Sequence, residues 1–157
     1  MSERANFTTE DFILRKELEF DEACRRHGLS QTSQRRAVLA ALSRRKDHPT
    51  ADQLYEELHM ELKGLSRTTV YRVLDALVGI GLVRRVTSLE AKARFDADTS
   101  RHHHLICINC GSVSDIHDPA LNMLALRPDQ SGDFRFLDYT ITFTGICSDC
   151  QQESESA

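Results

Sequence analysis

Several features are absent from this chain of 157 residues, and each absence excludes a class of protein. A membrane-spanning helix needs about 20 consecutive apolar residues, and no apolar run approaches that length. The first twelve residues are charged where a secretory signal would need an apolar stretch. We therefore predict a soluble, cytoplasmic protein with no membrane partner, folded as one domain or two small ones.

Two catalytic zinc motifs are also missing. The chain has no His-x-Glu beside Pro-Cys-x-x-Cys, which zinc deaminases use, and no His-Glu-x-x-His, which marks many zinc peptidases. Both chemistries need a glutamate base next to an open coordination position on the metal. Their absence argues against an enzyme, so the metal-binding residues that are present need another explanation.

Four of the five cysteines form two Cys-x-x-Cys pairs, Cys107 with Cys110 and Cys147 with Cys150, separated by 36 residues. In a reducing compartment such pairs indicate metal binding more than disulfides. Four thiolates make a soft, tetrahedral shell that favours zinc and binds it tightly enough to keep it. We therefore predict a structural Zn²⁺ site. The remaining Cys24 lies on an apolar helix face and is expected to be a small buried side chain.

Charge is distributed unevenly. Residues 1–95 carry 17 Lys and Arg against 14 Asp and Glu, whereas residues 96–157 carry 3 against 10, so that net charges of +3 and −7 give the overall −4. A basic half without an excess of aromatic residues suits a phosphate-backbone partner, and an ordinary solvated charge face is the alternative.

The basic half reads as helices. We expect them at Thr9–His27, stopped by Gly28, at Ser33–Arg45, and at Ala51–Leu62 after a capping box at Thr50. A fourth helix begins after Ser66 and buries one apolar face. Its first turns would then expose polar side chains suited to phosphates and base edges: Arg67, Thr68, Thr69, Tyr71 and Arg72.

Two short strands, Leu82–Thr87 and Lys92–Phe95, follow these helices. Three helices and a basic hairpin outline a winged helix that binds double-stranded DNA. Ordinary solvated helices followed by a hairpin remain the alternative.

From residue 96 onward the pattern changes to strands, so the predicted fold class is α+β. Short strands at 104–107 and 112–116 flank a zinc knuckle with Gly111 at its turn. A brief helix is expected at Pro119–Leu126, an alternating strand at Phe136–Ile146, and a polar disordered tail at 151–157. Because a three-stranded sheet this small is marginal alone, we predict a homodimer.

His102 and His104 stand two apart, so on a strand their side chains share one face. Asp115 on the next strand can reach that face. Two imidazoles and a carboxylate suit Fe²⁺, Mn²⁺ or Zn²⁺ and form a site distinct from the thiolates. A purely structural zinc-ribbon module would leave these residues and the basic helix without a role.

Several motifs in order resemble those of the ferric uptake regulator family: Thr32-Ser33-Gln34-Arg35, His48-Pro49-Thr50-Ala51, Thr69-Val70-Tyr71-Arg72, Arg94-Phe95-Asp96, and the tract from His102 to Gly111. The resemblance extends from about Leu29 to Cys150 and leaves out much of residues 1–20. It implies a metal-dependent repressor that binds an AT-rich inverted-repeat operator as a homodimer.

The resemblance also implies a domain plan and a ligand set. The plan is a winged-helix domain at 1–95, with an extra helical region at 1–20, a hinge at 96–101, and a small dimerisation domain with the zinc knuckle at 102–150. His48 and Asp96 join the strand residues as regulatory ligands, giving the set His48, Asp96, His102, His104 and Asp115. From the residues alone, His48 fits a solvated loop histidine and Asp96 a turn cap.

The resemblance favours the peroxide-responsive branch of the family. The aspartate at Asp115 and the complete cysteine site are typical of it, and bound Fe²⁺ would lead to oxidation of His48 or His102. Arg72 instead matches the recognition helix of iron-uptake regulators, so iron-, manganese- or zinc-responsive regulation remains an alternative. Iron-responsive members of the family carry an additional metal site made of histidines and acids. The matching positions here are a poor ligand set, so we expect no second exchangeable site: Arg101, His103, Asn122 and Tyr139.

Overall fold

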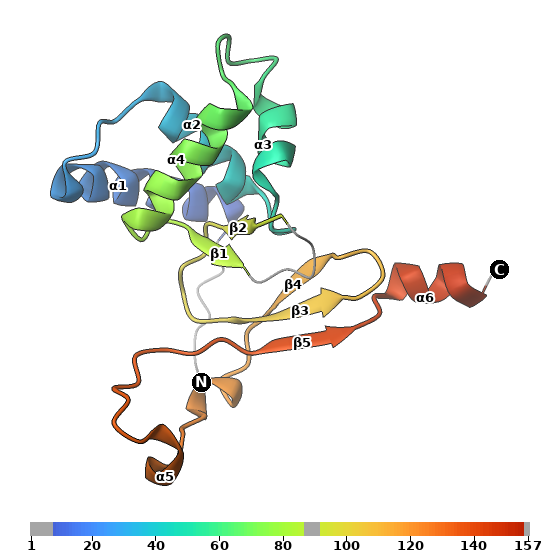
Figure 1. Ribbon diagram of the computed structural model, residues 1–157. Helices are drawn as coiled ribbons and strands as arrows, with labels where there is room; N and C mark the ends of the chain where they lie inside the picture. Colours follow the sequence, from blue (N-terminus) through green and yellow to red (C-terminus); the bar gives the residue numbers. More distant parts are fainter. Residues whose placement is uncertain (1–7, 87–91, 156–157) are drawn as a thin grey trace. The chain divides into compact units, whose positions relative to one another are not determined.

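The computed structural model describes residues 8–86 and 92–155, which lie in two compact units, Met1–Thr99 and Ser100–Ala157 (Figure 1). The boundary between the units lies within the segment 96–101, which the sequence analysis assigns to a hinge. Its behaviour as a hinge stays a prediction. Within the described residues, no helix is both long and apolar enough to cross a membrane.

The N-terminal unit contains helices followed by an antiparallel strand pair. Its elements are α1 (Thr9–His27), α2 (Ser33–Arg44), α3 (Ala51–Leu58), α4 (Arg67–Gly79), β1 (Arg84–Val86) and β2 (Arg94–Asp96). This is the winged-helix order that the sequence predicts. The predicted hairpin turn, with the end of the first strand at Thr87, falls in residues 87–91 and lies outside the described residues.

Local chemistry explains where these helices begin. Each N-cap is a Ser or Thr whose hydroxyl accepts the backbone N–H three residues later: Thr8, Thr32, Thr50 and Ser66. Thr50 and Gln53 complete the predicted capping box. Gly28, at φ 65°, ends α1 in the left-handed conformation that glycine adopts without strain.

One core joins these helices and includes Phe20, Leu42, Leu54 and Leu74, all fully buried. Helix α3 ends at Leu58, so the prediction of a helix to Leu62 is wrong. The chain leaves the helix in tight turns, in which the backbone N–H groups of residues 61 and 62 both donate to the Leu58 carbonyl.

Helix α1 buries Phe20 and Ala23 together with Cys24, as predicted for the cysteine, but not every apolar side chain of the helix is buried. Leu14 and Leu18 are exposed, whereas the Lys16 side chain is buried. The Lys16 ammonium lies 2.9 Å from a carboxylate oxygen of Glu19 and donates to the Thr99 hydroxyl. A lysine therefore fills the position where the helix approaches the end of the N-terminal unit.

The C-terminal unit is built on a three-stranded sheet in the order β4-β3-β5 (Figure 1). Its elements are β3 (His103–Cys107), β4 (Val113–Ile116), the 3₁₀ turn η1 (Leu121–Met123), α5 (Pro128–Ser131), β5 (Thr142–Gly145) and α6 (Ser148–Glu155). Strand β4 is antiparallel to β3, and β5 is parallel to it. Gly111, at φ 70°, occupies the predicted turn between β3 and β4.

Three predictions for this unit are wrong. The helix expected at Pro119–Leu126 is only η1, because Leu124 is already extended. The strand expected at Phe136–Ile146 shrinks to β5, the stretch that pairs with β3. The tail expected to be disordered from residue 151 continues α6 to Glu155, since acid near the helix start and a run of Gln and Glu favour a helix. Residues 156–157 lie outside the described part.

Candidate metal centres and DNA-binding helix

The four paired cysteines come together at one end of the sheet. Cys107 ends β3, Cys110 lies in the following turn, and Cys147 and Cys150 flank the start of α6. Their four Sγ atoms lie within 4.8 Å of one another, and those of Cys110 and Cys147 are 3.7 Å apart. A soft, four-sulfur set that converges in this way fits tetrahedral zinc. All four ligands belong to the C-terminal unit.

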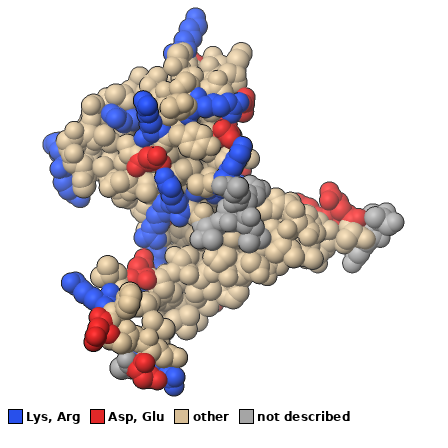
Figure 2. All heavy atoms as spheres, in the orientation of Figure 1, with Lys and Arg blue, Asp and Glu red and all other residues tan. Residues whose placement is uncertain are grey.

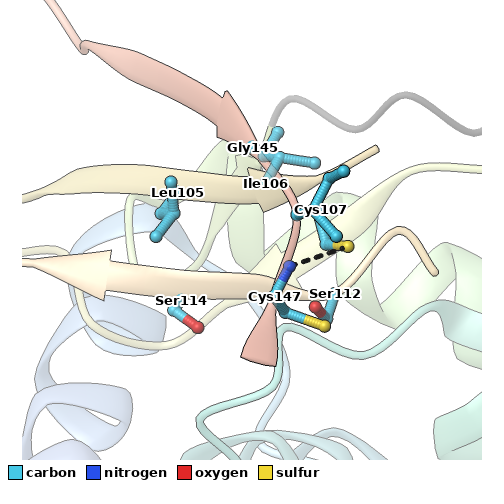
Figure 3. A pocket seen from close by; sticks show the side chains of 8 residues that line it. Leu105, Ile106, Cys107, Ser112, Ser114, Gly145 and Cys147 are labelled. Atoms are coloured by element: carbon cyan, nitrogen blue, oxygen red, sulfur yellow. Dashed lines mark hydrogen bonds between the residues drawn. The ribbon is translucent and has the colours of Figure 1, made fainter. Parts of the chain in front are cut away.

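Hydrogen bonds prepare part of this set for metal binding. The backbone amide of Cys147 donates to the Cys107 sulfur, as the dashed line in Figure 3 marks. Backbone hydrogen bonds from Cys110 and Cys147 lower the pKa of Cys107 from 9.0 to about 6. The Ser112 hydroxyl lowers the pKa of Cys110, whereas the hydrogen bond with Cys147 raises the pKa of Cys150. The directions differ because hydrogen bonds stabilise the thiolates of Cys107 and Cys110, whereas those of Cys150 to its neighbouring sulfurs favour its protonated form.

A small cavity of about 70 Å³ lies beside the cysteines, lined in part by Leu105, Ser114 and Cys147 (Figure 3). Pockets for organic ligands usually measure roughly 300 to 1,000 Å³. This cavity is too small for such a ligand, so we treat it as packing space next to the cysteine site.

A second set of ligand atoms lies on β3 and β4 and just before β3, and we call it the C-terminal half-site: His102, His104 and Asp115. His104 and Asp115 are direct cross-strand partners. The Asp115 Oδ1 atom lies 3.5 Å from His102 Nε2 and 3.8 Å from His104 Nε2. The carboxylate therefore faces both imidazoles, as the alternation of the strand predicts.

A hydrogen bond to the backbone fixes the orientation of the His102 ring. Its Nδ1 atom lies 2.9 Å from the Ser100 carbonyl oxygen, which can only accept, so that nitrogen carries the proton. Nε2 is then left with a lone pair directed towards Asp115. A ring held in this way is typical of metal-binding histidines, whose other nitrogen donates to the surrounding protein.

His48 and Asp96 form a separate pair in the N-terminal unit, which we call the N-terminal half-site. His48 Nε2 lies 3.5 Å from Asp96 Oδ2, and both side chains are buried. His48 has φ 52°, an uncommon conformation for a residue with a side chain, and such strain often marks functional positions. The buried His48 is not the solvated loop histidine that the sequence left open, whereas Asp96 does cap a turn, because its Oδ1 atom accepts the Asp98 backbone N–H at 2.8 Å.

Two residues to which the sequence analysis gave no role at a metal site lie against these half-sites. The buried guanidinium of Arg94 donates to the His48 carbonyl oxygen at 3.1 Å and so holds the loop before α3 against β2. The His117 ring lies 5.4 Å from the His102 ring, centroid to centroid. His117 follows Asp115 by two positions along the edge of the sheet, so the alternation of the strand could have indicated it.

Hydrogen bonds and ring contacts connect the side chains at the positions of the second exchangeable metal site, where the sequence predicts no metal. His103 is buried, with Nε2 3.2 Å from Asn122 Oδ1 and Nδ1 accepting the Ile141 amide. Arg101 lies over the Tyr139 ring at 4.3 Å. Hydrogen bonds and stacking therefore occupy these side chains and connect β3 to the segments around it.

The exposed turns of α4 carry the predicted DNA-contacting residues. Thr68, Tyr71 and Arg72 are exposed, whereas Thr69 is half-buried and its hydroxyl pairs with Ser66. Arg67 is exposed but engaged by Asp52 and Glu56 of α3. On the face shown in Figure 2, Lys and Arg side chains gather over the N-terminal unit. DNA contact by these residues stays a prediction.

A winged helix joined to a sheet unit with two candidate metal centres defines a metal-dependent, DNA-binding transcription regulator. The ferric uptake regulator family matches residues 26–144, and the chain belongs to that family. The peroxide-responsive repressor PerR of Staphylococcus epidermidis is 33% identical over 129 residues, which cover 82% of this chain and 86% of that protein.

Solved structures agree with this assignment. The ferric uptake regulator of Vibrio cholerae matches with a TM-score of 0.65 and 26% identity, over 82% of this chain and 99% of that one. The ferric uptake regulator of Pseudomonas aeruginosa with manganese matches with a TM-score of 0.64 and 26% identity, over 82% and 97%. These relatives confirm the α+β fold with a winged-helix domain. At the family level the partners are DNA and a second copy of the chain.

Proposed function

We propose that this protein is a cytoplasmic, homodimeric repressor whose binding to DNA depends on one divalent ion held by both half-sites. The observation that carries the proposal is that each unit presents a partial ligand set, three groups in the C-terminal unit and two in the N-terminal unit. Nitrogen and oxygen donors in these numbers suit Fe²⁺ or Mn²⁺, which prefer five or six ligands, better than a closed tetrahedral zinc site.

The division of the ligands supplies the switch. An ion that needs His48 and Asp96 together with the C-terminal half-site stabilises only arrangements of the units that bring all five groups together. If that arrangement suits two half-sites of an AT-rich inverted repeat, metal and DNA binding become coupled, typically by about 1 to 3 kcal/mol. The cysteine site keeps a permanent Zn²⁺ and plays no part in the switch.

We further propose that the protein senses hydrogen peroxide. The support is the 33% identity to a peroxide-responsive repressor and the aspartate, rather than glutamate, at Asp115. Bound Fe²⁺ would catalyse the reaction and end in the oxidation state in which it began. One peroxide oxygen would enter the C–H bond between the two nitrogens of His48 or His102 and the other would leave as water, so that the imidazole supplies both electrons that reduce the peroxide. The oxidised imidazole would be a poorer ligand, so the ion would no longer hold the two half-sites together and DNA would be released.

Mass mapping after peroxide treatment tests this proposal. The protein is loaded with Fe²⁺ without oxygen, given stoichiometric peroxide and digested, and a Mn²⁺-loaded sample serves as the matched control. We expect the peptide containing His48 or His102 to gain one oxygen in the iron form alone. If neither peptide from the iron-loaded protein gains an oxygen atom, the peroxide-sensing proposal is wrong. Metal-dependent repression would not be affected by that result.

Regulation of metal uptake is the second candidate, favoured by Arg72, which resembles the recognition helix of iron-uptake regulators. In that case Fe²⁺, Mn²⁺ or Zn²⁺ occupancy alone controls DNA binding. A gel shift with a palindromic AT-rich duplex, repeated at buffered concentrations of each ion, identifies the effective metal. Chelation must abolish the shift in either case.

A further inference from the structure

Asp52, on the first turn of α3, lies between two cations from other elements. One Oδ atom lies 3.3 Å from the Arg67 guanidinium of α4, and the other lies 2.6 Å from the Lys92 ammonium, just before β2. Glu56, one helical turn further along α3, also pairs with Arg67. The hydrogen bonds raise the pKa of Arg67 and of Lys92 and lower that of Asp52.

A ring contact completes the arrangement. The Arg67 guanidinium lies over the Tyr55 ring at 4.4 Å, and the ring belongs to the same face of α3 as the two carboxylates. Arg67 therefore has two acids and an aromatic face as partners, whereas no ion pair of the Arg72 guanidinium is seen among the described residues. Two arginines near the same end of α4 therefore have different surroundings.

Stability does not explain this acid cluster. The side chains of Asp52, Glu56, Arg67 and Lys92 are 25 to 61% exposed, and exposed ion pairs contribute little to folding free energy. Its position is more informative, because it lies where a recognition helix and a wing would both approach phosphates. Carboxylates that hold an arginine and a lysine there resemble the phosphates those cations would otherwise bind.

We propose that Asp52 and Glu56 form an internal phosphate mimic that occupies Arg67 and Lys92 and removes them from the DNA contact. Arg67 is then a positioning residue that fixes the start of α4 on α3, and the phosphate and base contacts fall to Thr68, Tyr71 and Arg72. The mimic lowers the non-specific, charge-driven part of DNA affinity and leaves sequence readout in place. This inference rests on the proposed function as a DNA-binding repressor.

The salt dependence of DNA binding tests the proposal, because each phosphate neutralised contributes about −0.9 to the slope of log K against log salt concentration. The probe is a palindromic AT-rich duplex, bound by Mn²⁺-loaded protein to avoid oxidation. We expect Asp52→Asn to steepen the slope by about 1 per protomer, as Lys92 becomes available while Glu56 still holds Arg67. Arg67→Gln should leave the slope unchanged, while Arg72→Gln should make it shallower or abolish binding.

Glu22→Gln is the matched control, since Glu22 pairs with an arginine within α1 and its replacement changes the net charge equally. A shallower slope in Arg67→Gln, together with an unchanged slope in Asp52→Asn, would overturn the proposal, because Arg67 would then contact phosphate in the native protein. Loss of all binding by folded Asp52→Asn would overturn it too. If the wild-type protein does not bind the duplex in a metal-dependent way, the proposed function itself fails.

Discussion

Removal of zinc should unfold the C-terminal unit and leave the N-terminal unit folded. Within the described residues, the buried apolar side chains of the C-terminal unit are only Ile106, Cys107 and Val113, whereas 19 residues form the core of the N-terminal unit. Full burial of Ile or Val contributes about 1.5 to 3 kcal/mol each, so these two supply at most roughly 6 kcal/mol. A structural zinc contributes about 10 to 16 kcal/mol in small zinc modules.

Hydrogen exchange measured by mass spectrometry resolves the two units. After extraction of zinc by a strong chelator, or in Cys147→Ser, we expect amides of β3 and β5 to exchange as fast as in an unfolded chain. Amides of α2 and α4 serve as the internal control and should keep their protection. If the β3 amides stay protected in protein shown to contain no zinc, the sheet is stable without the metal and the reasoning from its small core is wrong.

Three further predictions concern the metal centres. Replacing Asp115 with Glu should reduce sensitivity to peroxide more than it reduces Mn²⁺ affinity, as mass mapping and metal titration will show; equal effects would remove the argument from that position. Arg94→Gln removes the donor to the His48 carbonyl and should weaken Mn²⁺ binding by about 10- to 100-fold, as losses of supporting contacts often do, without loss of zinc. Cys107 has a pKa of about 6 when folded and 9.0 when free. This thiolate contribution is fully present above 9 and is lost as the pH falls through 6, so zinc affinity measured against a chelator should drop steeply over that window.

The helices of the N-terminal unit could be predicted because their signals are local. A hydroxyl before each helix and the glycine after α1 act within a few residues, and so does the apolar spacing of α4. Contacts between distant segments escaped prediction. Nothing in the sequence places Arg67 beside Glu56, and nothing gives Leu14 and Leu18 an exposed face while Lys16 is buried.

The sheet shows the same division between local and distant signals. Alternation along the chain predicted that His102 and His104 face Asp115, because a strand fixes which side chains share a side. Alternation also predicted a strand from Phe136, but a strand persists only where a neighbour supplies hydrogen bonds, and of the predicted stretch only residues 142–145 pair with β3. Tyr139, in the intervening stretch, donates its hydroxyl hydrogen to the Leu121 carbonyl instead.

The distribution of ligands between the units gives the two metals opposite roles. All four paired cysteines belong to one unit, so zinc affinity depends on the folding of that unit and not on its position relative to the other. The proposed regulatory ligands come from both units, so the affinity for that ion depends on how the units are arranged. Binding free energies are reciprocal, and DNA that favours the same arrangement must raise the affinity for the regulatory ion by the same factor by which the ion raises the affinity for DNA. The same DNA should leave zinc affinity unchanged, because no zinc ligand lies outside the C-terminal unit.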